Sequence, residues 1–182
     1  LGQINLEMTK HAKAGIYLNQ ALALRPGDAA TLCQLGRLAF QESRWSDAVA
    51  ALGHSRRLDA EAVEPAVAHL ISYQLGVALI EAGYDAAAIV QLDEFLTERR
   101  RFDRSSRYLR QMAALAQREP AVLAQMADAC VRLGRFSEAD DFYRQVAAEP
   151  SVKPDVMLGR LTFCDLVFGD DEAAAARILK LD

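Results

Sequence analysis

The chain has 182 residues, of which 52% are hydrophobic and 25% are charged, and this composition excludes intrinsic disorder. Its formal net charge of −4 excludes a global basic footprint for nucleic acid or an anionic membrane. No window approaches about 18 uninterrupted apolar residues, so no membrane-spanning helix is expected.

Long Ala- and Leu-rich periods, interrupted by only 5 Pro and 10 Gly, predict helix throughout the chain. One spacing recurs, because a small residue repeatedly precedes an Ala by twelve positions. In chain order the pairs are Gly2 and Ala14, Gly36 and Ala48, Gly76 and Ala88, and Ala127 and Ala139. Small side chains where two antiparallel helices cross let the backbones approach closely. The spacing therefore predicts a series of helix hairpins.

Turn residues fall between the two helices of each predicted hairpin. Ser43, Gly83 and Gly134 stand where the first helix ends, and glycine readily adopts the left-handed conformation that ends a helix. An aromatic residue follows in each case: Trp45, Tyr84 or Phe136. We expect the second helices to start near Ser46 and Ser137.

These motifs resemble the tetratricopeptide repeat family. Leu35-Gly36 followed by Ala48-x-x-x-Leu52, and Leu75-Gly76 followed by Ala88-x-x-x-Leu92, are similar to the family's 34-residue unit, which reads L-G, then A-x3-F, then P. The resemblance covers nearly the whole chain. It implies an all-α fold, with residues 1–182 forming a single right-handed superhelical solenoid of antiparallel helix pairs.

The resemblance also implies the repeat boundaries. We predict a partial first repeat over 1–28, a second repeat over 29–62, a third over 69–102, a fourth over 120–153, and a partial fifth repeat or cap over 154–182. The insertion at 63–68 contains Pro65 and is expected to lengthen the next helix at its N-terminus. Residues 103–119 are expected to form one extra helix.

The register of the last repeat has two alternatives. Leu158-Gly159 is similar to the family's Leu-Gly pair, but this alignment would place Asp171 at the tight crossing. The turn at Gly169 instead pairs Thr162 with Ala174. We favour the second alignment.

In this family the first helices of the repeats line a concave groove, so the resemblance implies that a protein or peptide partner binds there. Gln34, Gln74 and Gln125 share one equivalent position, and their amides could pair with the backbone of an extended peptide. The other predicted groove residues are Arg37, Gln41, Tyr73, Val77, Glu81, Asp128 and Arg132. The alternative is an ordinary solvated helix face. The Lys and Asn with which some members hold a C-terminal carboxylate are not reproduced.

Six arginines lie close together at the end of the third repeat and in the extra helix. They are Arg99, Arg100, Arg101, Arg104, Arg107 and Arg110. One interpretation is a solvated junction, and the other is a docking patch for an acidic protein segment, a phosphate or an anionic glycan. Nucleic acid is disfavoured, because the chain is acidic and no aromatics alternate with these arginines.

The sequence carries no catalytic signature. No Gly-rich phosphate loop, nucleophile elbow or His-x-x-x-His pair occurs, and the three histidines are dispersed, so we predict no enzyme activity and no cofactor. A metal site from Cys33 and His54 would need a coincidence of the fold, so no metal is predicted. Cys33, Cys130 and Cys164 are far apart and odd in number, which favours buried free thiols.

The leading hypothesis is a protein-interaction scaffold that binds a peptide or protein segment in the groove, as part of a bacterial multiprotein assembly. The alternatives are a targeting or regulatory module of a larger enzyme, such as a transferase, and a self-assembling architectural array. We expect a protein or peptide partner, no nucleic acid and no direct membrane insertion, and we leave self-association open. The cysteine pattern and the lack of a signal-peptide pattern favour a soluble protein of the bacterial cytoplasm over the periplasm.

Overall fold

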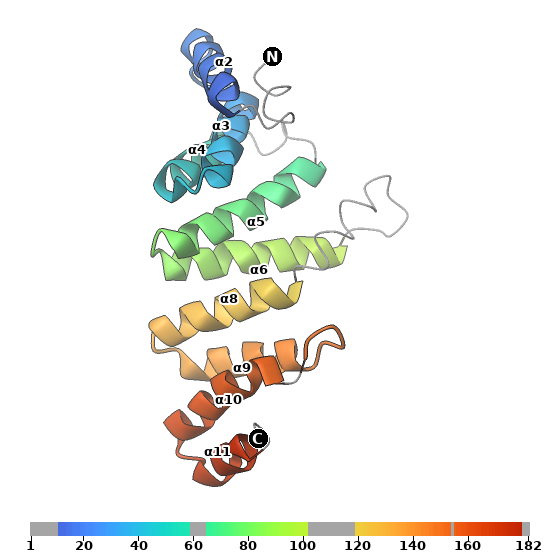
Figure 1. The fold of residues 1–182 in the computed structure, drawn as a ribbon. Coiled ribbons are helices and arrows are strands. Elements are labelled where there is room, and N and C mark those ends of the chain that lie inside the picture. The colour runs from blue at the N-terminus through green and yellow to red at the C-terminus, as the bar shows by residue number, and fades with distance from the viewer. Residues whose placement is uncertain (1–10, 59–64, 102–118, 154, 180–182) are drawn as a thin grey trace. The chain divides into compact units, whose positions relative to one another are not determined.

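The computed structural model describes residues 11–58, 65–101, 119–153 and 155–179, with the backbone alone for 65–70 and 98–101. Within these ranges all regular structure is helical (Figure 1). The helices are α2 (His11–Leu24), α3 (Ala29–Gln41), α4 (Trp45–Leu58), α5 (Pro65–Glu81), α6 (Asp85–Arg101), α8 (Glu119–Arg132), α9 (Phe136–Ala147), α10 (Asp155–Phe168) and α11 (Asp171–Ile178). The predicted all-α fold is confirmed. None of the described helices is long and apolar enough to cross a membrane.

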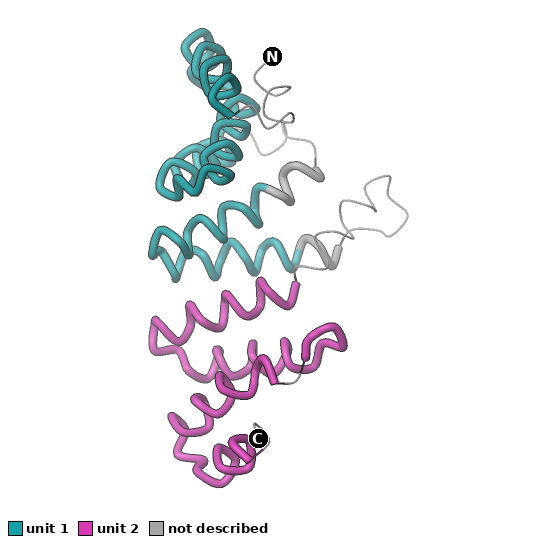
Figure 2. Tube along the Cα trace, viewed as in Figure 1, with its two compact units in different colours: residues 1–103 teal, residues 104–182 magenta. Residues whose placement is uncertain are grey.

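The chain divides into two compact units, residues 1–103 and 104–182 (Figure 2). In the first unit α2 packs on α3, α3 pairs with α4, and α5 pairs with α6, while α5 also packs against α3 and α4. In the second unit α8 pairs with α9, and α10 packs against both α9 and α11. Each pair consists of consecutive helices joined by a tight turn, which is the predicted hairpin organisation.

The turns within the hairpins have the left-handed backbone that the sequence predicts. The φ angle is 57° at Ser43, 81° at Gly83, 73° at Gly134 and 74° at Gly169. At each turn the next backbone N–H donates to a carbonyl five residues earlier, as from Tyr84 to Leu79 at 2.8 Å. Such bonds satisfy the last carbonyls of the first helix and stop it at a defined residue.

The second helices begin slightly earlier than predicted. α4 starts at Trp45 and α9 at Phe136, one residue before the expected Ser46 and Ser137. The N-cap of α9 is Arg135, whose side chain makes no capping hydrogen bond. The aromatic residue after the turn is thus the first residue of α4 and α9, and the serine already lies within the first turn.

Ser43 is the one non-glycine residue with positive φ in the described ranges, and this gives a testable expectation. The left-handed conformation costs an L-residue roughly 1–2 kcal/mol, whereas glycine adopts it readily but loses more backbone entropy on folding. We therefore expect Ser43→Gly to raise the free energy of unfolding by about 0.5–1 kcal/mol, measured by urea denaturation. An equal or lower stability of the variant would contradict this expectation.

The close approach of paired helices occurs where the small residues predict it, but the partner residue differs. A Cβ atom added to Gly36 would lie 2.6 Å from Cγ of Leu52, and one added to Gly76 would lie 2.6 Å from Cγ of Leu92. The nearest atoms therefore belong to a Leu one turn after the predicted Ala48 and Ala88. Helical side chains lean toward the helix N-terminus, so the later residue covers the surface in front of the glycine.

The predicted alanines are nevertheless part of the core. Ala48 clusters with Ala39 and Ala78, and Ala88 belongs to the cluster that contains Leu52 and Leu75. These small residues bring α5 close to the preceding hairpin as well as to α6. Tight contact thus extends from one hairpin to the next within the first unit.

The insertion before the third predicted repeat lengthens its first helix as expected, because α5 begins at Pro65 and has 17 residues against 13 for α3. The repeat boundaries themselves remain a prediction. The proposed extra helix at 103–119 falls almost entirely outside the described residues, as does the start of the first repeat.

The last hairpin agrees with the register set by the Gly169 turn. Thr162 and Ala174 are buried, whereas Gly159 is exposed and a Cβ atom added there would meet nothing within 4 Å. The alternative alignment, with Gly159 at the crossing, does not match this environment.

Candidate functional site

The predicted groove residues of the first unit differ in accessibility. On α3 Gln41 is exposed, and Gln34 and Arg37 are half-buried; on α5 Glu81 is exposed and Tyr73 is half-buried. Gln74 and Val77 are each only 8% exposed. These two predicted groove residues are therefore buried in the structure, and the others on the two helices are half-buried or exposed.

Arg37 organises the polar part of α3. Its Nη1 donates to Oε1 of Gln34 at 3.1 Å, while its buried Nε has no hydrogen-bond partner in the described part of the chain. Cys33 lies one turn earlier, and its burial raises the pKa of the thiol to about 11. At neutral pH the thiol is therefore protonated, which makes Cys33 a weak nucleophile in this environment.

Two of the three equivalent glutamines hold an unpaired oxygen. Oε1 of Gln74 on α5 and Oε1 of Gln125 on α8 are buried and accept no hydrogen bond from any residue that the structure describes. A buried acceptor left unpaired costs roughly 1–3 kcal/mol. The same unsatisfied group therefore occurs at the same position of two successive hairpins, one in each unit.

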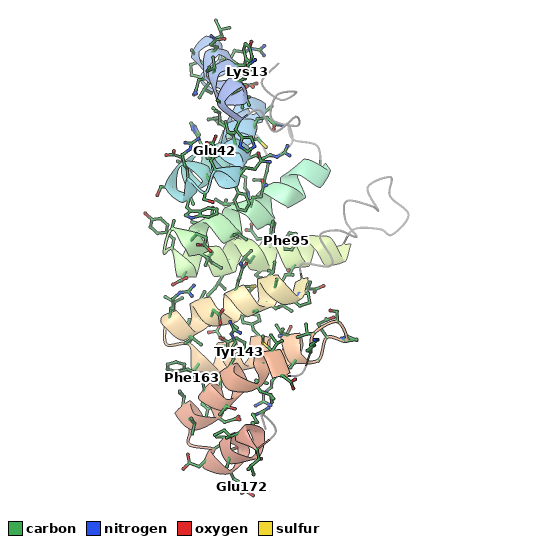
Figure 3. All side chains as sticks on the ribbon, viewed as in Figure 1. Lys13, Glu42, Phe95, Tyr143, Phe163 and Glu172 are labelled. Atoms are coloured by element: carbon green, nitrogen blue, oxygen red, sulfur yellow. The ribbon has the colours of Figure 1, made fainter. Side chains whose placement is uncertain are left out.

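Asp128, a predicted groove residue, is engaged inside the second unit. Tyr143 of α9, labelled in Figure 3, donates its hydroxyl to Oδ1 of Asp128 at 2.5 Å. Arg160 of α10 donates to the same carboxylate through Nε at 3.0 Å and Nη2 at 3.2 Å. Burial, with the hydrogen bond to Asp128 as a second cause, raises the pKa of the Tyr143 phenol above its ordinary value. The network ties three consecutive helices together.

Sequence reasoning missed Arg160, although a signal was present. Arg160 precedes Thr162 by two positions, as Gln34 precedes Gly36, so it occupies the glutamine position of the last hairpin. A cation at this position can reach Asp128, the acidic residue on the first helix of the preceding hairpin. Arg132, the last predicted groove residue of α8, is exposed.

A second carboxylate bound by arginine lies in the last hairpin, and this one is buried. Asp165 of α10 is 4% exposed and accepts from Nε of Arg177 on α11 at 2.5 Å. Nη2 of Arg144 on α9 is 3.9 Å from the other oxygen of this carboxylate. The family resemblance would place an aromatic side chain at position 165, so an ion pair replaces an apolar contact there.

The predicted arginine patch is not tested by the structure. Arg99, Arg100 and Arg101 lie in the last turn of α6, where only the backbone is described, and Arg104, Arg107 and Arg110 lie outside the described residues. Among the residues that are described, no three His, Cys, Asp or Glu side chains gather in a way that could hold a metal ion. The three cysteines are buried, and none of them forms a disulfide bond.

The fold is similar to several solved structures. The chain superposes on MamA with a TM-score of 0.64 at 17% identity, covering 100% of this chain and 92% of the other. It matches YrrB, a TPR protein with an unusual peptide-binding site, with a TM-score of 0.71 at 13% identity, covering 99% and 80%. A kinesin light chain of Podosopora anserina with TPR-like repeats gives a TM-score of 0.60 at 15% identity, covering 100% and 89%.

These likenesses confirm the tetratricopeptide-type fold, which is built of antiparallel helix pairs. The sequence itself matches no family model and no curated protein. Because the sequence identities are this low, the structural likeness is evidence for the fold alone and not for a function.

Proposed function

We propose that the chain is a non-catalytic scaffold, and that within each unit the first helices of the hairpins bind extended segments of other proteins. The observation that carries the proposal is the pair of unsatisfied amide oxygens of Gln74 and Gln125 at one equivalent position. A polar group that lowers stability and is nevertheless present at repeated positions is suited to a role in binding.

The amide chemistry fits an extended peptide. A side-chain rotation can turn either amide outward without breaking a hydrogen bond at Oε1, because that oxygen makes none within the described chain. Once turned outward, the oxygen can accept from a peptide N–H and the amide nitrogen can donate to a peptide carbonyl. Such contacts recognise the backbone of the partner segment more than its side chains.

Arg37 adds a donor to the face of the first unit. Its Nη1 donates to Oε1 of Gln34, which holds the guanidinium beside that amide, while its Nε is buried and has no partner within the described residues. It is suited to a carbonyl or carboxylate of the bound segment. YrrB, which has a similar fold, is itself a peptide-binding protein, and this supports a peptide partner here.

The test separates stability from binding. A random peptide library is selected on the full chain, and binders are measured against Gln74→Leu, Gln125→Leu and the double variant. We expect at least a tenfold loss of affinity in the double variant. Its urea stability should be equal to or higher than that of the parent, because an unsatisfied acceptor is removed.

Gln145→Leu is the matched control, since Gln145 is an exposed residue of the second helix α9. It should bind the selected peptides like the parent. If the double variant keeps full affinity, or if the library yields no binder, the proposed function is wrong. If the selected peptides bind as expected, assembly with bacterial partners is tested next, with the natural segment that those peptides resemble.

A further inference from the structure

Arg37 is a half-buried arginine whose charge the fold leaves unpaired. Three arginines of the described residues are half-buried: Arg37 on α3, Arg56 on α4 and Arg177 on α11. Nη2 of Arg56 lies 2.9 Å from a carboxylate oxygen of Glu94, and Nε of Arg177 lies 2.5 Å from one of Asp165. Arg37 forms no ion pair within the described part of the chain. Because a partly desolvated charge is costly without a counter-charge, this position is suited to a carboxylate from outside the chain.

Neither of the groups that interact with Arg37 in the described chain carries a negative charge. Its Nη1 donates to the amide oxygen of Gln34 at 3.1 Å, and that amide is neutral. The thiol of Cys33 also senses the charge of Arg37, but burial raises the pKa of this thiol to about 11, so it is neutral at pH 7. These contacts therefore leave the positive charge of Arg37 uncompensated.

The guanidinium of Arg37 keeps the edge that binds a carboxylate best. This edge is formed by Nε and Nη2, and the hydrogen bond to Gln34 does not use it. In the second unit Arg160 binds Asp128 with the same edge, through Nε at 3.0 Å and Nη2 at 3.2 Å. Two parallel N–H···O bonds of this kind are strong and directional. Nε of Arg37 is buried, so the outer bonds of the side chain must rotate to present this edge, at the cost of at most one hydrogen bond to a neutral amide.

The position of Arg37 is charged differently in the other hairpins. Arg37 directly follows Gly36, as Val77 follows Gly76 and Asp128 follows Ala127. Val77 is apolar and buried, so within the first unit only α3 carries a charge at this position. Asp128 already has a cation in its own unit, Arg160. The first unit thus presents an uncompensated cation where the second presents an ion pair.

We propose that the first unit selects an acidic side chain, so that an Asp or Glu of the bound segment forms an ion pair with Arg37. This selectivity rests on the proposed function, since it requires that a segment of another protein lies along α3 and α5, which contact each other. We infer a side chain as the source of the carboxylate, because a segment that contacts both helices runs past Arg37 and has its chain end elsewhere. The second unit has no such selectivity.

The test uses the peptides that the random library yields on the full chain. Peptides whose affinity falls in Gln74→Leu bind the first unit, and they should share an Asp or Glu at one position. Replacing that residue by Asn or Gln should lower the affinity for the parent about tenfold or more. The same replacement should not change the affinity for Arg37→Gln, because the ion pair is already absent there. The four affinities form a double-mutant cycle that isolates this pair.

Arg57→Gln is the matched control, since Arg57 is exposed on the second helix α4 and the substitution changes the charge by the same amount. It should keep the preference for the acidic residue. Peptides that are weakened by Gln125→Leu should need no acidic residue and should bind Arg37→Gln like the parent. Amidation of the peptide C-terminus should leave every affinity unchanged. Circular dichroism and urea unfolding confirm that both arginine variants fold.

Several results would overturn the selectivity while peptide binding as such still stands. They are the absence of a shared acidic residue in the peptides that bind the first unit, an unchanged preference in Arg37→Gln, and binding that is lost on amidation alone. A library in which no peptide depends on Gln74 overturns it as well. If the library yields no binder at all, the proposed function is wrong, and the selectivity is wrong with it.

Discussion

Gly36→Ala should lower the free energy of unfolding of the first unit by about 3 kcal/mol, as expected for overpacking of a tight helix crossing. The added Cβ would lie 2.6 Å from Cγ and 3.0 Å from the backbone N of Leu52. Contact with backbone leaves no rotamer change that relieves the clash, so α3 and α4 must move apart. Urea denaturation followed by circular dichroism measures the loss.

Two other glycines make this expectation specific. Gly76→Ala also meets its partner Leu92, but the backbone N is 3.5 Å away, so rotation of the side chain relieves part of the strain and the loss should be smaller. Gly53→Ala meets only the end of a flexible arginine at 3.8 Å and should raise stability by up to about 1 kcal/mol through helix propensity. If the three variants show the reverse order of stability losses, or equal losses, the tight helix crossing does not lie at Gly36 as the structure has it.

Arg177→Ala should lower the stability of the second unit by about 3 kcal/mol, because removing one partner of a buried ion pair leaves an uncompensated charge. Asp165 is 4% exposed, and the next cation, Arg144, is 3.9 Å away with a largely exposed side chain. The loss should appear as unfolding of α11 before the rest, which amide hydrogen exchange can resolve by residue.

A double replacement distinguishes charge burial from simple loss of contact. Asp165→Leu together with Arg177→Met keeps most of the volume and removes both charges, so it should recover most of the lost stability. Glu138→Ala, which breaks the exposed ion pair between Glu138 and the N-cap residue Arg135, should leave the free energy of unfolding almost unchanged. If the double variant is as unstable as Arg177→Ala, charge burial is not the cause.

The hairpins were predictable from the sequence because their determinants are local. The small residue and the alanine stand twelve positions apart, the turn residue lies between them, and the partner helix follows immediately. The crossing at Gly36 and the turns at Gly83 and Gly134 could therefore be predicted without knowledge of the rest of the fold. The same local rule aligned the last hairpin on Thr162. Its error was one helical turn at the contact itself, since Leu52 and Leu92 face the glycines. Side-chain direction in a helix accounts for that difference.

Only the tertiary structure decided which polar residues are already engaged and which apolar residues are open. Asp128 and Gln125 looked alike as candidates on one helix face, yet Asp128 is bound by Tyr143 and Arg160, whereas the amide oxygen of Gln125 has no partner among the described residues. Likewise Leu166 is exposed although the equivalent Phe40 is packed. These states depend on neighbouring helices that are distant in sequence, and spacing along one hairpin carries no information about what covers it.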